Sequence, residues 1–443
     1  MAKSSQAPEQ PPLERARALR IAGETQDALR LAAAAVGADA SDPGAALLLA
    51  RLLDEAGRDE AAAEAAPRLV DAHVRRGDLP AARLAAELGD RTAALGIIAE
   101  AFGAGSPRVQ LDAAPAPPPL PRPVRLTPPL SEAQGEPLLS LCEQALSRFD
   151  EADDPVAADR PLPRLPLFGS LQATRLQRLL AAMTPRELAA GEAAVTEGEE
   201  GDAAYVVVRG ALEVRRRGRG GAGGDGGDLL AVLGPGALFG EMALVSSAPR
   251  AASAVASCPT ELLVMTRAAL EELAAEDQAL ARELSSFCHG RMVANLLRHG
   301  ALLSAVPAAE RATLMAAFSP RTFEAGEALV RAGDEPSALH LIASGAVQVR
   351  APDAEGERVR LAELGPGDVV GEISLVLRRP ANADAVASHR TLTLSLDRDG
   401  FHAVIDRHPA LLKQLYDMAV HREAETRNIL GQAPVDADDM VLL

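Results

Sequence analysis

The chain contains the stretch AAMTPRELAAGEAAVTEGEEGDAAYVVVRGALEVR at residues 181–215 and repeats its pattern as AAFSPRTFEAGEALVRAGDEPSALHLIASGAVQVR at residues 316–350. Four positions recur with one constant spacing: Pro185, Gly191, Gly198 and Gly210 return as Pro320, Gly326, Gly333 and Gly345. A Gly-Pro-Gly triplet at 234–236 also returns, at 365–367, but four positions earlier than the spacing of the other four pairs predicts. The first copy therefore has four extra residues, which we place in a loop at 215–228. Residues 165 to 430 are therefore predicted to hold an internal duplication.

Each copy has the sequence pattern of a small β domain. In the second copy apolar residues alternate before and after Gly345, as they do in half-buried strands joined by a turn. In the first copy an apolar run ends just before Gly210. Short strands with glycine turns predict a β-barrel or jelly roll in each copy, followed by a helical stretch. We expect one such domain over 165–299, a second over 300–430, and a tail over 431–443.

The segment FGEMALVSSAPRAAS, residues 239–253, has the residue types of an anion-binding loop. Gly240 permits close approach of the backbone to a ligand. The residues from Glu241 onwards can form a short helical turn whose free N–H groups face an anion. The Glu241 carboxylate can accept a hydrogen bond from a hydroxyl group, and Arg250 offers a fixed fork of donors for phosphate oxygens.

Glu241 and Arg250, nine residues apart, resemble the phosphate-binding cassette of cyclic-nucleotide-binding domains. This is the family of the catabolite activator protein and of the regulatory subunit of cAMP-dependent protein kinase. The resemblance implies a ligand-binding set of Phe239, Gly240, Glu241, Met242, Ala243, Arg250, Ala251 and Ala252. The residue after the arginine is often Thr in cGMP-preferring members and is Ala251 in this chain. The resemblance therefore favours cAMP, with cGMP as the alternative. In the alternative interpretation, the Glu241 carboxylate caps its own loop, Arg250 is a surface side chain, and the pocket is empty.

The second copy of the cassette has Gly371, Glu372 and Ser374, but Ala381 stands at the arginine position. Arg379 lies on the other side of Pro380, and Asp384 adds a negative charge. A phosphate there would meet repulsion and no guanidinium. We expect the second domain to keep the fold and to have lost ordinary cyclic-nucleotide binding.

Residues 1–104 have the pattern of α-helical hairpin repeats. One helix face is apolar over Ala45, Leu48, Leu49, Leu52, Leu53 and Ala56. Gly23 and Gly57 punctuate the pattern, and their spacing matches the period of about 34 residues of the tetratricopeptide repeat, which this region resembles. An unspecialised bundle of helical hairpins is the alternative. A Pro-rich linker over 105–164 is expected to contain one helix, over 131–150.

Composition excludes several function classes. The 443 residues carry a formal charge of −17, which opposes general binding to nucleic acid or to anionic lipid. No apolar run approaches the roughly 20 residues of a membrane span. The three cysteines form no zinc or disulfide pattern and fit a reducing cytosol. The segment after the last predicted helix is short, which favours a protein without a winged helix-turn-helix. Neither catalytic motifs nor metal or cofactor motifs are apparent.

Together these features define an α+β multidomain chain: N-terminal helical repeats, then two β-barrel or jelly-roll domains with flanking helices. The resemblance implies a cytoplasmic cyclic-nucleotide effector that acts on a protein partner held by the N-terminal repeats. The alternatives are a ligand-independent scaffold with structural barrels, and a regulatory subunit of an unidentified enzyme.

Overall fold

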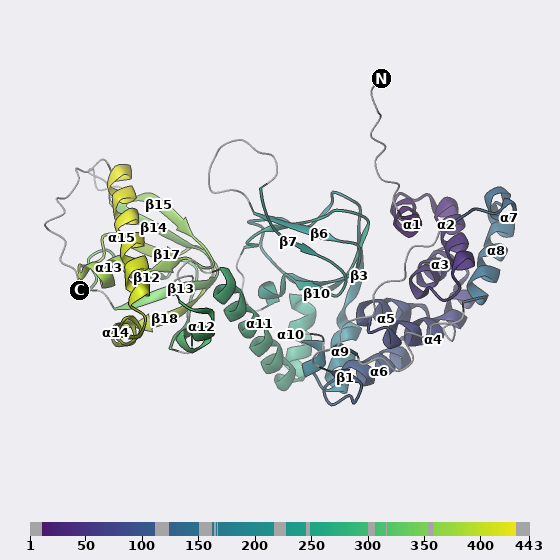
Figure 1. Cartoon of the computed structure of the whole chain (residues 1–443), viewed down its shortest axis with the longest axis horizontal. Helices are drawn as coiled ribbons and strands as arrows, with labels where there is room; N and C mark the ends of the chain where they lie inside the picture. The colour runs from purple at the N-terminus through teal and green to yellow at the C-terminus, as the bar shows by residue number, and fades with distance from the viewer. Residues whose placement is uncertain are drawn as a thin grey trace, which may run out of the picture. The chain divides into compact units, whose positions relative to one another are not determined.

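A computed structural model describes residues 11–110, 124–149, 162–163, 165, 167–216, 227–244, 249–299, 306–315, 317–335, 337–352 and 358–430 (Figure 1). The chain divides into two compact units. The first comprises the residues up to Thr196, Ala203–Phe239 and Ala252–Leu284. The second comprises Glu197–Asp202, Gly240–Ala251 and the residues from Ser285 onwards.

The first unit begins with helical hairpins. Its N-terminal helices are α1 Pro12–Ile21, α2 Thr25–Ala38, α3 Pro43–Glu55, α4 Asp59–Arg75, α5 Leu79–Ala85 and α6 Arg91–Phe102, with the 3-10 turn η1 Ala86–Leu88. Gly23 and Gly57 have φ of 80° and 79° and lie between the two helices of successive hairpins. Glycine adopts this left-handed conformation without a steric penalty, so it stops one helix and lets the next begin two residues later. The helical hairpins are present, and their assignment to the tetratricopeptide family stays a prediction.

The helix expected in the linker belongs to this helical array. It is shorter than predicted, α8 Gly135–Ser147, and a separate short helix, α7 Pro128–Glu132, precedes it. The buried Cys142 of α8 has its Sγ atom 3.8 Å from the carbonyl oxygen of Leu29, because α8 packs against α2. The Pro-rich run at 111–123 lies outside the described residues. Strand β1 Val109–Gln110 precedes this run, and strand β2 Leu162–Pro163 follows α8. The two strands pair in parallel.

The first β domain is a sandwich of two four-stranded sheets, preceded by the turn η3 Phe168–Ser170 and by α9 Ala173–Ala182. The sheet orders are β3-β10-β5-β8 and β4-β9-β6-β7. The strands are β3 Thr184–Leu188, β4 Ala193–Val195, β5 Ala203–Arg209, β6 Leu212–Arg216, β7 Asp228–Leu233, β8 Leu238–Phe239, β9 Ser253–Ala256 and β10 Thr260–Thr266. Leu188, Val207, Leu212 and Leu262 lie at the centre of its core. Residues 217–226, which contain most of the loop with the four-residue insertion, lie outside the described residues.

The second β domain repeats this topology within the second unit. Its sheet orders are β11-β18-β13-β16 and β12-β17-β14-β15. The strands are β11 Ser319–Phe323, β12 Ala328–Val330, β13 Ala338–Ser344, β14 Val347–Pro352, β15 Arg358–Leu364, β16 Val369–Val370, β17 Asp384–Ala387 and β18 Thr391–Asp397. The predicted fold class, helices followed by two jelly-roll-like domains, is therefore confirmed.

Helices follow or interrupt each sandwich. They are α10 Arg267–Glu276, α11 Gln278–His299, α12 Ala308–Met315, α13 Glu372–Leu377, α14 Arg398–Arg407 and α15 Pro409–Leu430. Each long helical stretch expected from the sequence breaks after one short helix, at Asp277 and at His408. Leu411 and Leu415 of α15 lie in the same buried cluster as Leu339 and Leu341 of β13. Within the described residues, no helix combines the length and the apolarity that crossing a membrane requires.

Candidate functional site

The first cassette begins with a sharp turn and a helical turn. Gly240 has φ of 73°, a left-handed conformation that favours glycine. The next residues form the 3-10 helix η4, Glu241–Leu244. Its Met242 is half-buried and packs against a buried cluster that includes Met292 of α11. Ala243 lies within the same turn. The helical turn expected from the sequence is thus present.

The carboxylate of Glu241 is buried, with 5% of the residue exposed. Arg291 of α11 donates from Nε to Glu241 Oε1 at 3.0 Å. Cys288, one turn earlier on the same helix, has its Sγ atom 3.6 Å from the Glu241 carbonyl oxygen. A buried carboxylate needs such a charged partner because an unpaired charge in the interior costs several kcal/mol. The helix after the first sandwich is therefore tied to the cassette by an ion pair.

Arg250 is half-buried and reaches back to the start of the same cassette. Its Nη1 atom donates to the carbonyl oxygen of Gly240 at 3.1 Å, which brings the guanidinium next to the residue that precedes Glu241. The Arg250 backbone is fixed on both sides: its N–H donates to Glu199 at 2.8 Å and its carbonyl accepts from Gly198 at 2.9 Å.

The remaining residues of the predicted set adjoin these two in the sequence. Phe239 is buried on β8, and its ring stacks on Tyr205 of β5 with centroids 5.0 Å apart. Ala251 is exposed and Ala252 is half-buried. Both alanines keep this part of the chain free of bulky side chains.

The second cassette has the same construction. Gly371, with φ of 91°, is followed by α13, and a Cβ atom at Gly371 would lie 2.4 Å from the Ala338 carbonyl oxygen. Glu372 and Ser374 on α13 are both buried. Arg422 of α15 donates from Nη1 to Glu372 Oε1 at 2.7 Å. The cassette glutamate of each copy is therefore bound to an arginine from the helix that follows its sandwich.

Ala381 occupies the backbone position that Arg250 has in the first copy. Its N–H donates to Asp334 at 2.9 Å and its carbonyl accepts from Gly333 at 2.7 Å. Asp334 and Gly333 correspond to Glu199 and Gly198 in the alignment of the two copies. The two loops share this backbone conformation, but Ala381 has no guanidinium and so contributes no cation.

The expected role of Asp384 as a repelling charge is wrong. Asp384 is buried and its carboxylate forms an ion pair with Arg358 of β15 at 2.6 Å. Its other oxygen accepts from the Ala332 N–H at 2.9 Å. Because this charge is already compensated, the difference between the two cassettes lies in the missing guanidinium.

Sequence reasoning missed Arg291 and Arg422. Each lies 50 residues after its cassette glutamate, on α11 and on α15 respectively. Extending the comparison of the two copies through their C-terminal helices would have found this pair, because the two arginines are separated by the same spacing as the two glutamates.

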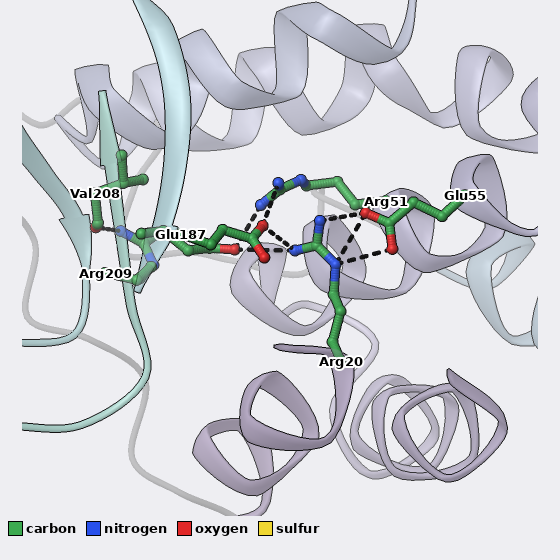
Figure 2. Close-up of polar contacts among 7 residues, drawn as sticks. Arg20, Arg51, Glu55, Glu187, Val208 and Arg209 are labelled. Atoms are coloured by element: carbon green, nitrogen blue, oxygen red, sulfur yellow. Dashed lines mark hydrogen bonds and ion pairs between the residues drawn. The ribbon is translucent and has the colours of Figure 1, made fainter. Parts of the chain in front are cut away.

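The helical array is attached to the first sandwich by an arginine–glutamate interface. It consists of Arg20 of α1, Arg51 of α3, Glu187 of β3 and Glu261 of β10, of which Figure 2 labels the first three. Arg51 contacts both glutamates, with Nη2 donating to Glu187 at 2.7 Å. Arg20 also contacts both, at 2.7 Å and 3.3 Å. Burial opposes ionisation of Glu261, but Arg51, Arg17 and Arg20 outweigh it and hold the Glu261 pKa below its ordinary value. The neighbouring strands β3 and β10 are thus both held by the N-terminal helices α1 and α3.

A second contact between array and sandwich involves Asp78 and Arg209. Asp78 caps α5 by accepting from the Ala81 N–H at 3.2 Å. The same carboxylate binds Arg209 at the end of β5 at 2.5 Å. Although burial opposes ionisation, Arg209 holds the Asp78 pKa well below its usual value. One carboxylate thus stabilises a helix start and a domain contact.

Comparison with known proteins identifies the class of the two sandwiches. Residues 185–277 and 320–408 each match the family model of the cyclic nucleotide-binding domain. Two segments of the chain, one in each sandwich region, therefore resemble the cyclic nucleotide-binding domain. Among the described residues, no group of three or more His, Cys, Asp or Glu side chains is placed to hold a metal ion.

The curated relatives that match include regulatory subunits of cAMP-dependent protein kinase. The chain is 30% identical over 239 residues to a cAMP-dependent protein kinase regulatory subunit of Yarrowia lipolytica, which covers 54% of this chain and 58% of the relative. It is 26% identical over 307 residues to a type II regulatory subunit of Drosophila melanogaster, covering 65% and 77% of the two chains. The chain thus spans little more than half the length of the Yarrowia relative.

Among solved structures, the regulatory domain of Toxoplasma gondii PKA with cAMP is 24% identical and covers 58% of this chain and 92% of that one, with a TM-score of 0.28. The catabolite activator protein of Thermus thermophilus is 32% identical and covers 31% and 62%, with a TM-score of 0.27.

Proposed function

We propose that the chain is a cyclic-nucleotide sensor whose first domain binds cAMP. The observation that carries this proposal is the return of Arg250 to the Gly240 carbonyl at 3.1 Å, beside Glu241. A guanidinium and a carboxylate on one cassette offer donors for a cyclic phosphate and an acceptor for a ribose hydroxyl. Arg291 engages one oxygen of Glu241. The second oxygen can accept a hydrogen bond from a ligand hydroxyl.

The second domain is proposed to keep its fold without binding cyclic nucleotide. Ala381 lies at the backbone position of Arg250 and contributes no cation for a phosphate. A structural role for this domain is the simpler interpretation, since its cassette is held by Arg422.

cAMP is proposed over cGMP because Ala251 follows the arginine. The small, exposed Ala251 side chain has no hydroxyl group. A threonine at this position would offer a further hydrogen bond. Direct competition between cAMP and cGMP for the site therefore tests this preference.

The output is proposed to be a contact with a cytoplasmic protein partner through the N-terminal helices. These helices are bound to the first sandwich by Arg20 and Arg51, so a change in that sandwich reaches the array through side-chain ion pairs. Such coupling works only when the ligand has different affinities for two conformations. The second candidate, a regulatory subunit of a protein kinase, is favoured by the 30% identity to the Yarrowia regulatory subunit.

Calorimetric titration of the full chain with cAMP and with cGMP tests the proposal. We expect one site per chain, tighter for cAMP. Arg250→Ala should weaken binding by about 30-fold or more, which corresponds to roughly 2 kcal/mol or more for truncation of a buried charged contact. Arg379→Ala, in the second cassette, is the matched control and should bind as the wild type does. Two equal sites, or unchanged binding by Arg250→Ala, would contradict the assignment.

The scaffold alternative gives a different result in the same experiment. Without a ligand site, neither heat of binding nor a cAMP-dependent rise in melting temperature would be seen, because only binding to the native state stabilises it. Co-purification with a kinase catalytic chain would favour the second candidate.

A further inference from the structure

Strand β7 concentrates exposed apolar side chains. Leu229, Leu230 and Val232 have 52%, 46% and 61% of their surface exposed. They are three of the six large hydrophobic residues that are exposed in the described part of the chain. Scattered exposed apolar residues are ordinary, but three within four positions form a patch, and such patches mark interaction sites.

β7 is also the terminal strand of its sheet. In the order β4-β9-β6-β7 it pairs with β6 alone among the described strands (Figure 1). An edge strand presents backbone N–H and C=O groups that can pair with a further strand. The duplicated domain offers an internal comparison, because β15 is the terminal strand of the corresponding sheet. β15 carries Arg358, Arg360 and Glu363, the charged residues that commonly protect an edge.

We propose that β7 is a self-association edge, on which the β7 strand of a second copy of this chain pairs in antiparallel orientation. The strand is self-complementary. A two-fold axis midway between the two facing Ala231 residues sets Leu230 opposite Val232 and Leu229 opposite Leu233. No like charges then face each other, and apolar side chains meet across the pair. Such a contact uses the same surface on both copies, so it closes at a dimer.

Local charge does not oppose a second copy. The chain carries −17 in total, but beside β7 the carboxylate of Glu213 is paired with Arg215 at 2.8 Å. Two acidic chains repel each other at long range. At ordinary ionic strength, salt screens this repulsion beyond about 8–10 Å. Added salt should therefore strengthen the dimer, whereas a contact built on ion pairs would weaken.

The dimer is expected to be weak. Stable interfaces bury about 1,200–2,000 Å² in total, more than one six-residue strand from each copy supplies. Sedimentation velocity of the full chain over a range of concentrations, at low and at high salt, should show a monomer–dimer equilibrium that shifts to dimer at high salt.

Two variants identify the surface. Val232→Lys places a charge on the edge, as β15 has, and should raise the dissociation constant at least tenfold. Ile97→Lys changes a residue on α6 with 51% exposure and should leave the equilibrium unchanged. Circular dichroism would verify that both variants fold. A chain that stays monomeric at all concentrations would overturn the proposal. This outcome would also be seen if β7 pairs with a strand of another protein instead of a second copy. Equal effects of the two variants would also overturn it.

Discussion

Glu372 and Arg422 are joined by a hydrogen bond of 2.7 Å between a buried carboxylate and a guanidinium fifty residues later in the chain. Glu241 and Arg291 repeat the relationship at 3.0 Å. The pair was kept in the second domain although the cassette arginine was not, as Ala381 shows. A contact between the cassette glutamate and the C-terminal helix is therefore common to both domains.

Arg422→Ala should destabilise the second domain. The change leaves the buried Glu372 carboxylate without its cation, and we expect the free energy of unfolding to fall by about 1–3 kcal/mol. Urea denaturation followed by circular dichroism measures this. Arg390→Ala removes an exposed ion pair with Glu324 and should cost about 0–1 kcal/mol. Adding Glu372→Gln to Arg422→Ala should restore part of the loss. Equal stability of the two single variants would contradict the role of the pair.

Glu261 should make stability depend on pH. Its pKa in the folded chain is lowered, although burial alone would raise it, because Arg51, Arg17 and Arg20 favour the carboxylate. The stabilisation is therefore fully present above the ordinary glutamate pKa of 4.5 and is lost as pH falls below that value towards the folded pKa. The difference in unfolding free energy between wild type and Glu261→Gln should shrink on going from pH 7 to acidic pH. A difference that is constant with pH would show that the charge of Glu261 does not contribute to stability.

The three cysteines should differ in reactivity. Burial raises the pKa of Cys142 and of Cys288 to about 12, and both side chains are shielded. Cys258 is partly exposed. Since the thiolate is the reactive form, iodoacetamide at pH 8 should label Cys258 alone in the native chain. Labelling in urea should reach all three, and mass spectrometry of peptides distinguishes them. Native labelling of Cys142 at the rate of Cys258 would mean that α8 is not packed on α2.

Two glycines of the second sandwich should respond differently to alanine. Gly345 and Gly333 have φ of 96° and 88°, so each substitution carries about 1–2 kcal/mol of backbone strain. At Gly345 the new Cβ would also lie 2.4 Å from Thr391 Oγ1 and 2.7 Å from Thr391 Cα, whereas Gly333 has open space. Gly345→Ala should therefore be less stable than Gly333→Ala by a further 1–3 kcal/mol or so, the usual cost of overpacking. Thermal unfolding of both variants compares them, and equal melting temperatures would refute the close approach.

The sequence allowed the fold class to be predicted because glycines and alternating apolar residues recur in both copies. The turn glycines mark positions where only one residue type avoids strain, so they remain visible after the rest has diverged. The cassette around Glu241 and Arg250 was recognisable for the same reason, since its residues are close together in the chain.

Contacts between distant segments could not be predicted in this way. Glu261 lies 210 residues from Arg51, and nothing in the local pattern of either residue indicates the other. The compensation of Asp384 by Arg358 was missed because a charge was judged from its neighbours in sequence. Similarly, α8 has an ordinary amphipathic pattern, which says that one face is buried but not against what.

The pairing of β1 with β2 closes the base of a long excursion of the chain, with Val109 beside Leu162 and Gln110 beside Pro163. Inside that excursion, α8 is fixed to α2. A protease that cut once between Gln110 and α7 would therefore produce two fragments that stay together in solution, joined by a strand pair and a helix contact.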